Sequence, residues 1–208
     1  TKSSAASDVY KRQGHGVPGA FMTLIVTSVL DQIAASAPAG LPTTRFMTLI
    51  HEGVCRQLGI TAGMRGHDGL DCAVVRIDRQ RDILEFSGAS IDLFSITPDG
   101  AVSRHRGSRK TLGYSLDQGV DQIRSTSIPM GDNAFLITTD GLLTQVGEAT
   151  RRVMGTRRFE AGLKEAGTNE PARLIRTAAR VLKAWQGREE RRDDVAVVTF
   201  RPNDLRAK

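Results

Sequence analysis

The 208-residue chain contains little cysteine and few aromatic residues. Its two cysteines, Cys55 and Cys72, both fall inside periodic apolar segments. Two isolated cysteines do not supply the disulfide framework of a small secreted protein. We therefore expect both to be buried, reduced thiols in a cytoplasmic domain.

Long hydrophobic runs are also missing. No stretch approaches the roughly 20 consecutive apolar residues of a membrane-spanning helix, and the N-terminus lacks the apolar core of a signal peptide. Hydrophobic residues make up 39% and charged residues 25% of the chain, which excludes a disordered polymer. The length suits one domain with a sizeable core.

The charge pattern argues against a nucleic-acid partner. The formal net charge is +6, but basic residues are mixed with acidic ones, as in REERRDD (188–194). No basic stripe is interleaved with aromatic side chains, as single-strand binding would favour. We therefore predict that the chain does not bind nucleic acid.

Residues 1–13 differ from the rest of the chain. They are small and polar, then basic, and they show neither helical nor strand periodicity. We expect them to be a non-native or disordered leader that makes few contacts. The domain then covers residues 14–202, and residues 203–208 are a short tail.

The remaining sequence predicts an α+β fold. Helical periodicity over 19–36 and 44–59 changes to strand periodicity near Leu70. Strands and helices do not alternate, so we expect antiparallel sheets covered by helical layers, not a doubly wound parallel sheet. The predicted strands are 70–78, 83–90, 91–97, 101–106, 120–129, 133–139 and 194–202, and two further helices are predicted over 156–167 and 170–185.

Acidic residues stand at the ends of two predicted strands. Asp140 ends one apolar strand and is followed by glycine, and Asp193-Asp194 directly precedes another. Carboxylates at the ends of adjacent strands can converge on a hard divalent cation such as Mg²⁺ or Mn²⁺. The same spacing also fits a simple turn at Asp140 and a solvated cap at Asp193, and the pattern leaves these alternatives open.

A glycine elbow, GHGVPGA (14–20), precedes the first apolar helix. Glycine allows close backbone approach, and a helix N-terminus attracts anions such as phosphate. His15 is a candidate general acid or metal-shell group, although no partner for it is evident from the sequence. No serine or cysteine stands in a nucleophile motif.

Four segments together resemble one family. GHGVPGAFMTLI (14–25), ILEFSGAS (83–90), FLITTDGLLTQVG (135–147) and RRDDVAVVTF (191–200) resemble the bacterial PP2C-like serine/threonine phosphatases of the stage II sporulation protein E type. The resemblance covers residues 14–201. It implies an α-β-β-α sandwich of antiparallel sheets flanked by helical layers. It also implies two divalent cations, Mn²⁺ or Mg²⁺, and a metal-activated water that attacks a phosphoserine or phosphothreonine.

The resemblance also assigns residues. Asp140 and Asp193 match metal-binding, catalytic aspartates, Asp194 lies beside them as a further metal ligand, and the elbow Gly14-His15-Gly16 lines the metal site. The family places another metal-binding aspartate at a strand end three residues before this elbow, where this sequence has Lys11. The first strands of the fold are therefore expected to be missing, and we expect this chain to be weakly active or inactive.

The resemblance further implies a partner-switching pathway. The expected substrate is a phosphorylated regulatory protein of the anti-sigma-factor antagonist type. A homodimer and a membrane-anchored parent protein, with this segment in the cytoplasm, are compatible with the family. The alternative is a non-catalytic phosphatase-like module that binds such a regulator without turnover. Lys11 favours this alternative, whereas Asp140 and Asp193 favour an enzyme.

Overall fold

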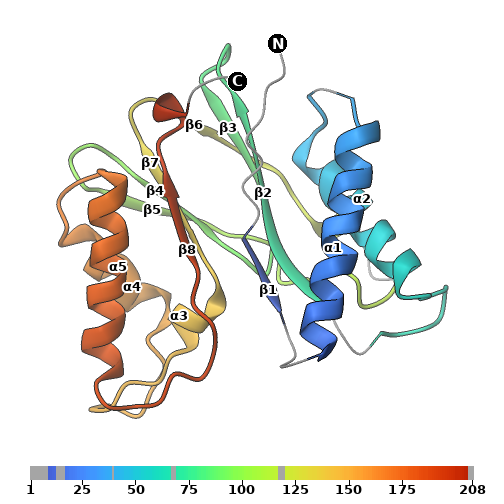
Figure 1. The fold of residues 1–208 in the computed structure, drawn as a ribbon. Helices are drawn as coiled ribbons and strands as arrows, with labels where there is room; N and C mark the ends of the chain where they lie inside the picture. The colour runs from blue at the N-terminus through green and yellow to red at the C-terminus, as the bar shows by residue number, and fades with distance from the viewer. Residues whose placement is uncertain (1–8, 13–16, 39, 67–68, 117–119, 206–208) are drawn as a thin grey trace. The chain divides into compact units, whose positions relative to one another are not determined.

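The structure, a computed structural model, describes residues 9–12, 17–38, 40–66, 69–116 and 120–205 (Figure 1). The chain forms two compact units. Unit 1 comprises Thr1–Ile91, Gly107–Pro129 and Ala207–Lys208, and unit 2 comprises Asp92–Arg106 and Met130–Arg206. Each unit contains one four-stranded sheet with helices of its own.

The sheet of unit 1 has the strand order β1-β2-β3-β6, and every neighbouring pair is antiparallel (Figure 1). Its strands are β1 (Val9–Arg12), β2 (Leu70–Asp78), β3 (Ile83–Ala89) and β6 (Thr126–Pro129). A short 3₁₀ turn, η1 (Val120–Gln122), comes before β6. The predicted strand over 120–129 is therefore correct only in its last four residues.

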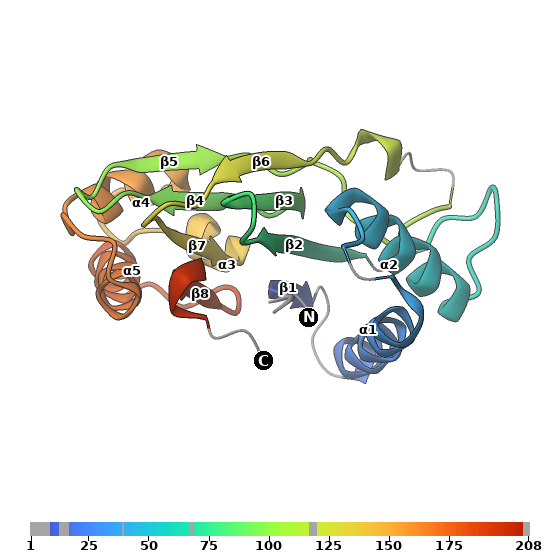
Figure 2. The same cartoon turned by 90° about the horizontal axis from the view of Figure 1, so that it is seen from above.

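Two helices cover one face of this sheet, α1 (Val17–Ser36) and α2 (Thr43–Gln57). They lie side by side, as Figures 1 and 2 show from two directions. Their apolar residues meet those of β2 in one core, which includes Val29, Met47, Val54 and Leu70. The prediction that these two helices pack together on one face is confirmed.

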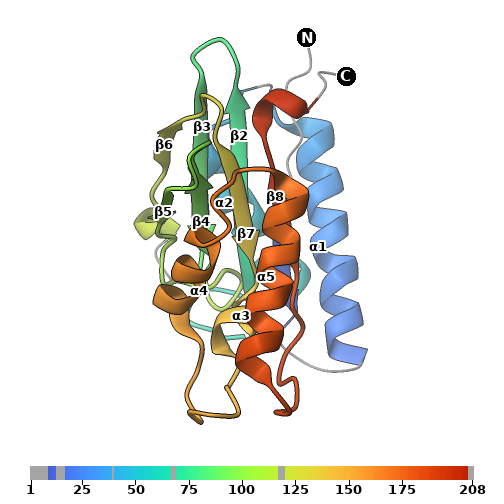
Figure 3. The ribbon, with the colours of Figure 1, turned by 90° about the vertical axis from the view of Figure 1, so that its left-hand side faces the viewer.

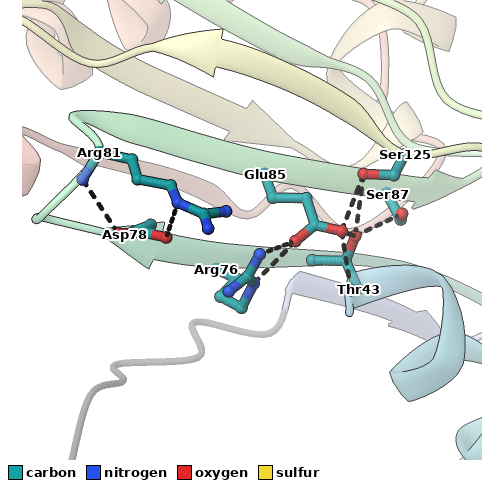
Figure 4. Close-up of polar contacts among 7 residues, drawn as sticks. All are labelled: Thr43, Arg76, Asp78, Arg81, Glu85, Ser87 and Ser125. Atoms are coloured by element: carbon teal, nitrogen blue, oxygen red, sulfur yellow. Dashed lines mark hydrogen bonds and ion pairs between the residues drawn. The ribbon is translucent and has the colours of Figure 1, made fainter. Parts of the chain in front are cut away.

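A buried carboxylate fixes the start of α2 to the sheet (Figure 4). Glu85 on β3 accepts hydrogen bonds from the backbone N–H of Thr43 at 3.1 Å, from its hydroxyl at 3.0 Å and from the Ser125 hydroxyl at 2.9 Å. Its other oxygen pairs with Arg76 on β2, with Nη2 at 2.6 Å. Glu85 therefore satisfies a helix N-terminal donor, which needs a partner when buried.

The sheet of unit 2 has the strand order β5-β4-β7-β8, again entirely antiparallel. Its strands are β4 (Leu93–Ile96), β5 (Val102–His105), β7 (Ala134–Thr138) and β8 (Val197–Phe200). The helical elements are α3 (Asp140–Thr144), α4 (Gly155–Lys164), α5 (Pro171–Gln186) and the 3₁₀ turn η2 (Pro202–Asp204). The α+β class with antiparallel sheets is therefore confirmed.

Helices α4 and α5 pack against each other and against the sheet of unit 2 (Figure 3). The ring of Phe94 on β4 meets that of Phe159 on α4 edge to face, with centroids 5.5 Å apart. The carboxylate of Glu170 accepts hydrogen bonds from the N–H groups of Ala172 and Arg173, and Pro171 occupies the first turn. This cap and proline explain why α5 begins where the sequence predicted.

Residues 9–12 correct the expectation of a leader with few contacts. They form β1, which pairs with β2 in a register that places Lys11 opposite Asp71. Four residues are too short to show strand periodicity, and the open edge of β2 supplies the partner that the local sequence does not reveal. The non-native origin of residues 1–13 stays a prediction.

One helix is long and apolar enough to cross a membrane by length and composition alone, over Gly19–Ser36. Because small and polar residues are interspersed with the apolar ones in α1, this helix does not overturn the expectation that the segment lies outside a membrane. The helix lies near the N-terminus, where a signal sequence would pass the same test, so the finding is weak evidence. Cys55 and Cys72 are reduced and buried, as predicted.

Candidate metal centre

The candidate site lies where β7 ends and β8 begins. These strands are antiparallel neighbours, with Thr138 opposite Val197. Backbone pairing continues past the strand, because the N–H of Thr139 donates to the carbonyl of Ala196 at 3.1 Å. The residue after Thr139 is Asp140, and the residues just before Ala196 include Asp194. Pairing therefore brings the two predicted acidic positions to the same end of unit 2.

The side chain of Thr139 strengthens this connection. Its hydroxyl donates to the carbonyl of Asp194 at 3.1 Å and accepts from the N–H of Ala196 at 3.0 Å. Thr139 is 4% exposed, so these bonds are largely shielded from water. They fix the backbone of the acidic pair relative to the end of β7.

Gly141 lets the two segments approach closely. A Cβ atom at this position would lie 2.4 Å from the carbonyl oxygen of Asp194 and 3.2 Å from the Cβ of Asp193. Gly141 does not have a positive φ, and Asp140 begins helix α3. The glycine is therefore required for space, and the alternative that Asp140-Gly141 is a simple turn is wrong.

The three aspartates differ in exposure. Asp140 and Asp193 are half-buried, whereas Asp194 is exposed. The N–H of Asp194 donates to Oδ1 of Asp193 at 2.9 Å. A cation bound near these segments would offset the negative charge of their carboxylates.

The donor chemistry of this site suits a hard divalent cation, because carboxylate oxygens are what Mg²⁺ and Mn²⁺ prefer. The number of donors is smaller than a complete centre needs. Among the residues that the structure describes, no group of three or more His, Cys, Asp or Glu side chains is placed to hold a metal ion. Asp140 and Asp193 by themselves therefore do not complete a metal centre within the described residues.

The structure does not describe the elbow that was predicted to line the site. Gly14, His15 and Gly16 lie outside the described residues. Lys11 lies in β1, directly before them in the chain. A strand is thus present where the resemblance expects one, but Lys11 occupies the position of the expected aspartate.

Two loops of unit 2 hold the segment that leads into Asp193. The side-chain amide of Gln145 donates to the carbonyl of Glu190 at 3.0 Å, and the N–H of Arg188 donates to Glu148 at 3.0 Å. Arg151 also pairs with Glu189. These contacts connect the residues after α3 with the residues after α5.

Sequence reasoning missed Thr139, Gly141 and Gln145 as supporting residues. All three lie in the segment TTDGLLTQ (138–145), and all are buried. The second threonine directly before an aspartate is a sequence signal that could have indicated a side-chain bond to a neighbouring strand, whereas the burial of Gln145 is known only from the structure.

The antiparallel sheets, with helices packed on them, match the fold of PP2C phosphatase domains. The chain belongs to the stage II sporulation protein E (SpoIIE) family, whose model matches residues 7–203. This match begins inside the segment that we expected to be a leader. A comparison with curated proteins found no match.

Solved structures agree with this family. The chain is 28% identical to the SiaA-PP2C domain of Pseudomonas aeruginosa, covering 93% of this chain and 73% of that one, with a TM-score of 0.77. The RsbU and RsbW domains of a Mycobacterium tuberculosis protein match with 18% identity, 92% and 50% coverage and a TM-score of 0.66. The phosphatase domain of Bacillus subtilis SpoIIE, solved with a fragment of its regulatory domain, matches with 17% identity, 93% and 52% coverage and a TM-score of 0.62. The last two show the fold alone, and the chain spans about half of their length.

Proposed function

We propose that this chain is a protein serine/threonine phosphatase domain that depends on divalent cations. Its substrate would be a phosphoserine or phosphothreonine on a small regulatory protein of the anti-sigma-factor antagonist type. The observation that carries the proposal is the close approach of the Asp193-Asp194 segment to Gly141, the residue after Asp140, at the paired ends of β7 and β8. Membership of the SpoIIE family supports it.

Asp140 and Asp193, with Asp194 beside them, are the residues that would hold a cation. A bound cation would supply an activated water and offset the charge of the phosphoryl group. Related structures of the same fold support Mn²⁺ or Mg²⁺, because PstP was solved with two manganese ions and RsbX with magnesium. The role of Thr139 and Gly141 is to keep the two carboxylate-bearing segments together.

Lys11 lowers the activity that we expect of the chain as it stands. By resemblance it replaces a metal-binding aspartate, so one negative charge is lost and one positive charge is added. A unit charge about 4 Å from a cation changes its energy by about 4 kcal/mol at an effective dielectric of about 20. We therefore expect weak Mn²⁺ binding and phosphate release barely above background.

The second candidate function is a non-catalytic module that binds the regulator without turnover. Lys11 in β1 supports it, together with the incomplete donor set among the described residues. The two functions differ in one respect that can be measured. An enzyme should gain activity when position 11 carries a carboxylate, whereas a binding module should not.

The test is a Mn²⁺-dependent phosphate-release assay on phosphoserine peptides and p-nitrophenyl phosphate. It compares the chain, Lys11→Asp, and Lys11→Asp combined with Asp140→Asn. Lys110→Asp, an exposed change of the same charge on a loop of unit 1, is the control. We expect activity only in Lys11→Asp. Strong activity of the unchanged chain would show that the ligands are misassigned, and inactivity of Lys11→Asp on every substrate would favour the binding module.

The remaining parts of the proposal follow from the family. Cytoplasmic location, a partner-switching pathway and the choice between manganese and magnesium stay predictions. A homodimer and a membrane-anchored parent protein also stay predictions. Such a pathway is consistent with two of the similar structures. One contains RsbU and RsbW domains, and the other is a stressosome protein.

A further inference from the structure

Helix α5 carries a stripe of positive charge. Its 16 residues include four basic residues and no acidic one. Spacings of three and four residues place the four on one side of the helix, along about 15 Å at 1.5 Å per residue. All four are exposed, whereas Leu174, Ala178 and Leu182 on the other side are buried in the core of unit 2. The basic stripe consists of Arg173, Arg176, Arg180 and Lys183.

The unit itself does little to neutralise this stripe. Arg176 lies 3.6 Å from Glu170, and both side chains are largely exposed, at 70% and 44%. In the described part of the chain, no carboxylate lies within ion-pair distance of Arg173, Arg180 or Lys183. Like charges three and four residues apart destabilise a helix, so folding alone does not favour this arrangement.

The neighbouring helix α4 is also mainly basic. Helix α4 packs beside α5 and has three basic residues, Arg157, Arg158 and Lys164, with Glu160 as its acid (Figure 3). Arg157, Arg158 and Lys164 are all exposed, and the guanidinium of Arg158 lies over the ring of Trp185, 4.7 Å from its centroid. Together α4 and α5 carry seven basic residues and one acidic residue, but only those of α5 form a regularly spaced stripe.

The surroundings of the stripe disfavour a membrane. The apolar side of α5 is buried in the core and is not available to enter a bilayer, and Ile175 is the large apolar residue of α5 that is exposed, at 44%. They also disfavour single-stranded nucleic acid. Trp185, the aromatic residue of α5, contacts the guanidinium of Arg158 and donates its indole N–H to the backbone carbonyl of Gln145. Its ring is therefore not available for base stacking.

We propose that the basic stripe of α5 is a docking surface for an acidic protein, namely a helix that presents carboxylates at matching spacing. Charge complementarity along one narrow helix suits one partner helix, because a polyanion would contact a broader surface of one sign. That this partner is the phosphorylated regulator rests on the proposed function. Helix α5 leads through residues 187–192 into Asp193, so the docked protein would be bound by the same unit that carries the acidic pair.

The test measures binding without turnover, so its failure and the failure of the phosphatase proposal are distinguishable. Fluorescence anisotropy follows a labelled helical peptide with four glutamates at the spacing of the stripe. A second peptide has the same composition with its glutamates spread around the helix. The variant replaces Arg173, Arg176, Arg180 and Lys183 by glutamine. The control variant replaces four exposed basic residues of unit 1 by glutamine, namely Arg56, Arg109, Lys110 and Arg124.

We expect the matched peptide to bind at least about fivefold more tightly than the spread peptide at low salt, because several exposed ion pairs form together. This preference should disappear in the stripe variant, persist in the control variant and weaken as salt is added. Equal binding of the two peptides would overturn the proposal. Tighter binding of duplex DNA or phosphatidylserine vesicles than of the matched peptide would also overturn it, as would an equal loss in the control variant. Circular dichroism confirms that both variants are folded.

Discussion

The side-chain hydroxyl of Thr139 donates a hydrogen bond to the backbone carbonyl of Asp194 at 3.1 Å. The same hydroxyl accepts from the N–H of Ala196 at 3.0 Å. One side chain thus joins the end of β7 to the acidic pair before β8. Because it bonds to backbone atoms, it sets the position of the segment and leaves the carboxylates of Asp193 and Asp194 to other partners.

Replacing Thr139 with valine keeps the shape of the side chain but removes both hydrogen bonds. We expect the free energy of unfolding to fall by about 1–3 kcal/mol, because the N–H of Ala196 loses its acceptor. In the Lys11→Asp background, Mn²⁺ affinity should fall as well. Urea denaturation and calorimetry measure the two effects. The control is Thr150→Val, an exposed threonine in the loop after α3, which should change stability by no more than about 0.5 kcal/mol. Unchanged Mn²⁺ affinity in Thr139→Val would mean that this residue does not position the site.

Gly141→Ala tests the close approach of the two segments. The added Cβ would lie 2.4 Å from the carbonyl oxygen of Asp194, so the backbone of one segment must move. We expect a loss of about 1–3 kcal/mol in stability, as for overpacked cores, and weaker Mn²⁺ binding by the Lys11→Asp protein. Thermal unfolding with and without Mn²⁺ separates the two effects. If alanine is tolerated with full Mn²⁺-induced stabilisation, the close approach is not needed for metal binding.

Glu85 is predicted to stabilise unit 1 through its ionised form. Burial acts to raise the pKa of Glu85, but hydrogen bonds from Arg76, Ser125 and Thr43 outweigh it and hold the pKa below the ordinary value. Glu85→Gln should therefore lower the free energy of unfolding at pH 7 by about 2–3 kcal/mol, because Arg76 and the start of α2 lose a charged acceptor. Asp78→Asn is the matched control.

Asp78, the last residue of β2, pairs with Arg81 in the turn before β3 at 4.0 Å, and the Arg81 side chain is 77% exposed (Figure 4). Asp78→Asn should lower the free energy of unfolding by less than about 1 kcal/mol. The stability provided by Glu85 is fully present above about pH 4.5 and lost as the pH falls through the lowered folded-state value. Glu85→Gln should therefore be less sensitive to acid than the unchanged chain in urea titrations below pH 4.5. Equal effects of the two substitutions at pH 7 would contradict this assignment.

His51 should make stability depend on pH in the range below 6.5. Burial lowers the pKa of His51 from its ordinary value of 6.5, and its Nδ1 accepts a hydrogen bond from the N–H of Gly113 at 3.1 Å. The unfolded chain therefore binds a proton before the folded chain does, and stability falls as the pH drops below about 6.5. The slope from one such group is at most about 1.4 kcal/mol per pH unit.

His51→Asn retains an acceptor for Gly113 but cannot be protonated in this range. We expect it to be less stable at pH 7.5 and to have a shallower dependence on pH between 6.5 and 5.5, measured by urea denaturation. Burial also lowers the pKa of His105 in unit 2, so part of the slope should persist in this variant. A slope identical to that of the unchanged chain would show that His51 does not contribute.

The sequence by itself determined the elements whose residues follow a local period. Residues 70–78 were predicted as a strand and form β2 with the same bounds, and the helices at 19–36 and 170–185 are within two residues of α1 and α5. It also indicated Asp140 and Asp193 as the acidic positions at strand ends. These features are local, because side-chain period and helix caps are encoded in neighbouring residues.

The tertiary structure decided which strands pair and which distant residues become neighbours through that pairing. Only pairing with β2 makes β1 a strand, and only the order β5-β4-β7-β8 places the end of β7 beside the start of β8. The bonds of Thr139 to Asp194 and Ala196, 55 and 57 residues away, follow from that order. Strand pairing depends on backbone hydrogen bonds and packing between distant segments, which no local pattern specifies. The sequence therefore indicated the acidic ligands, and the fold supplied the neighbours that hold them together.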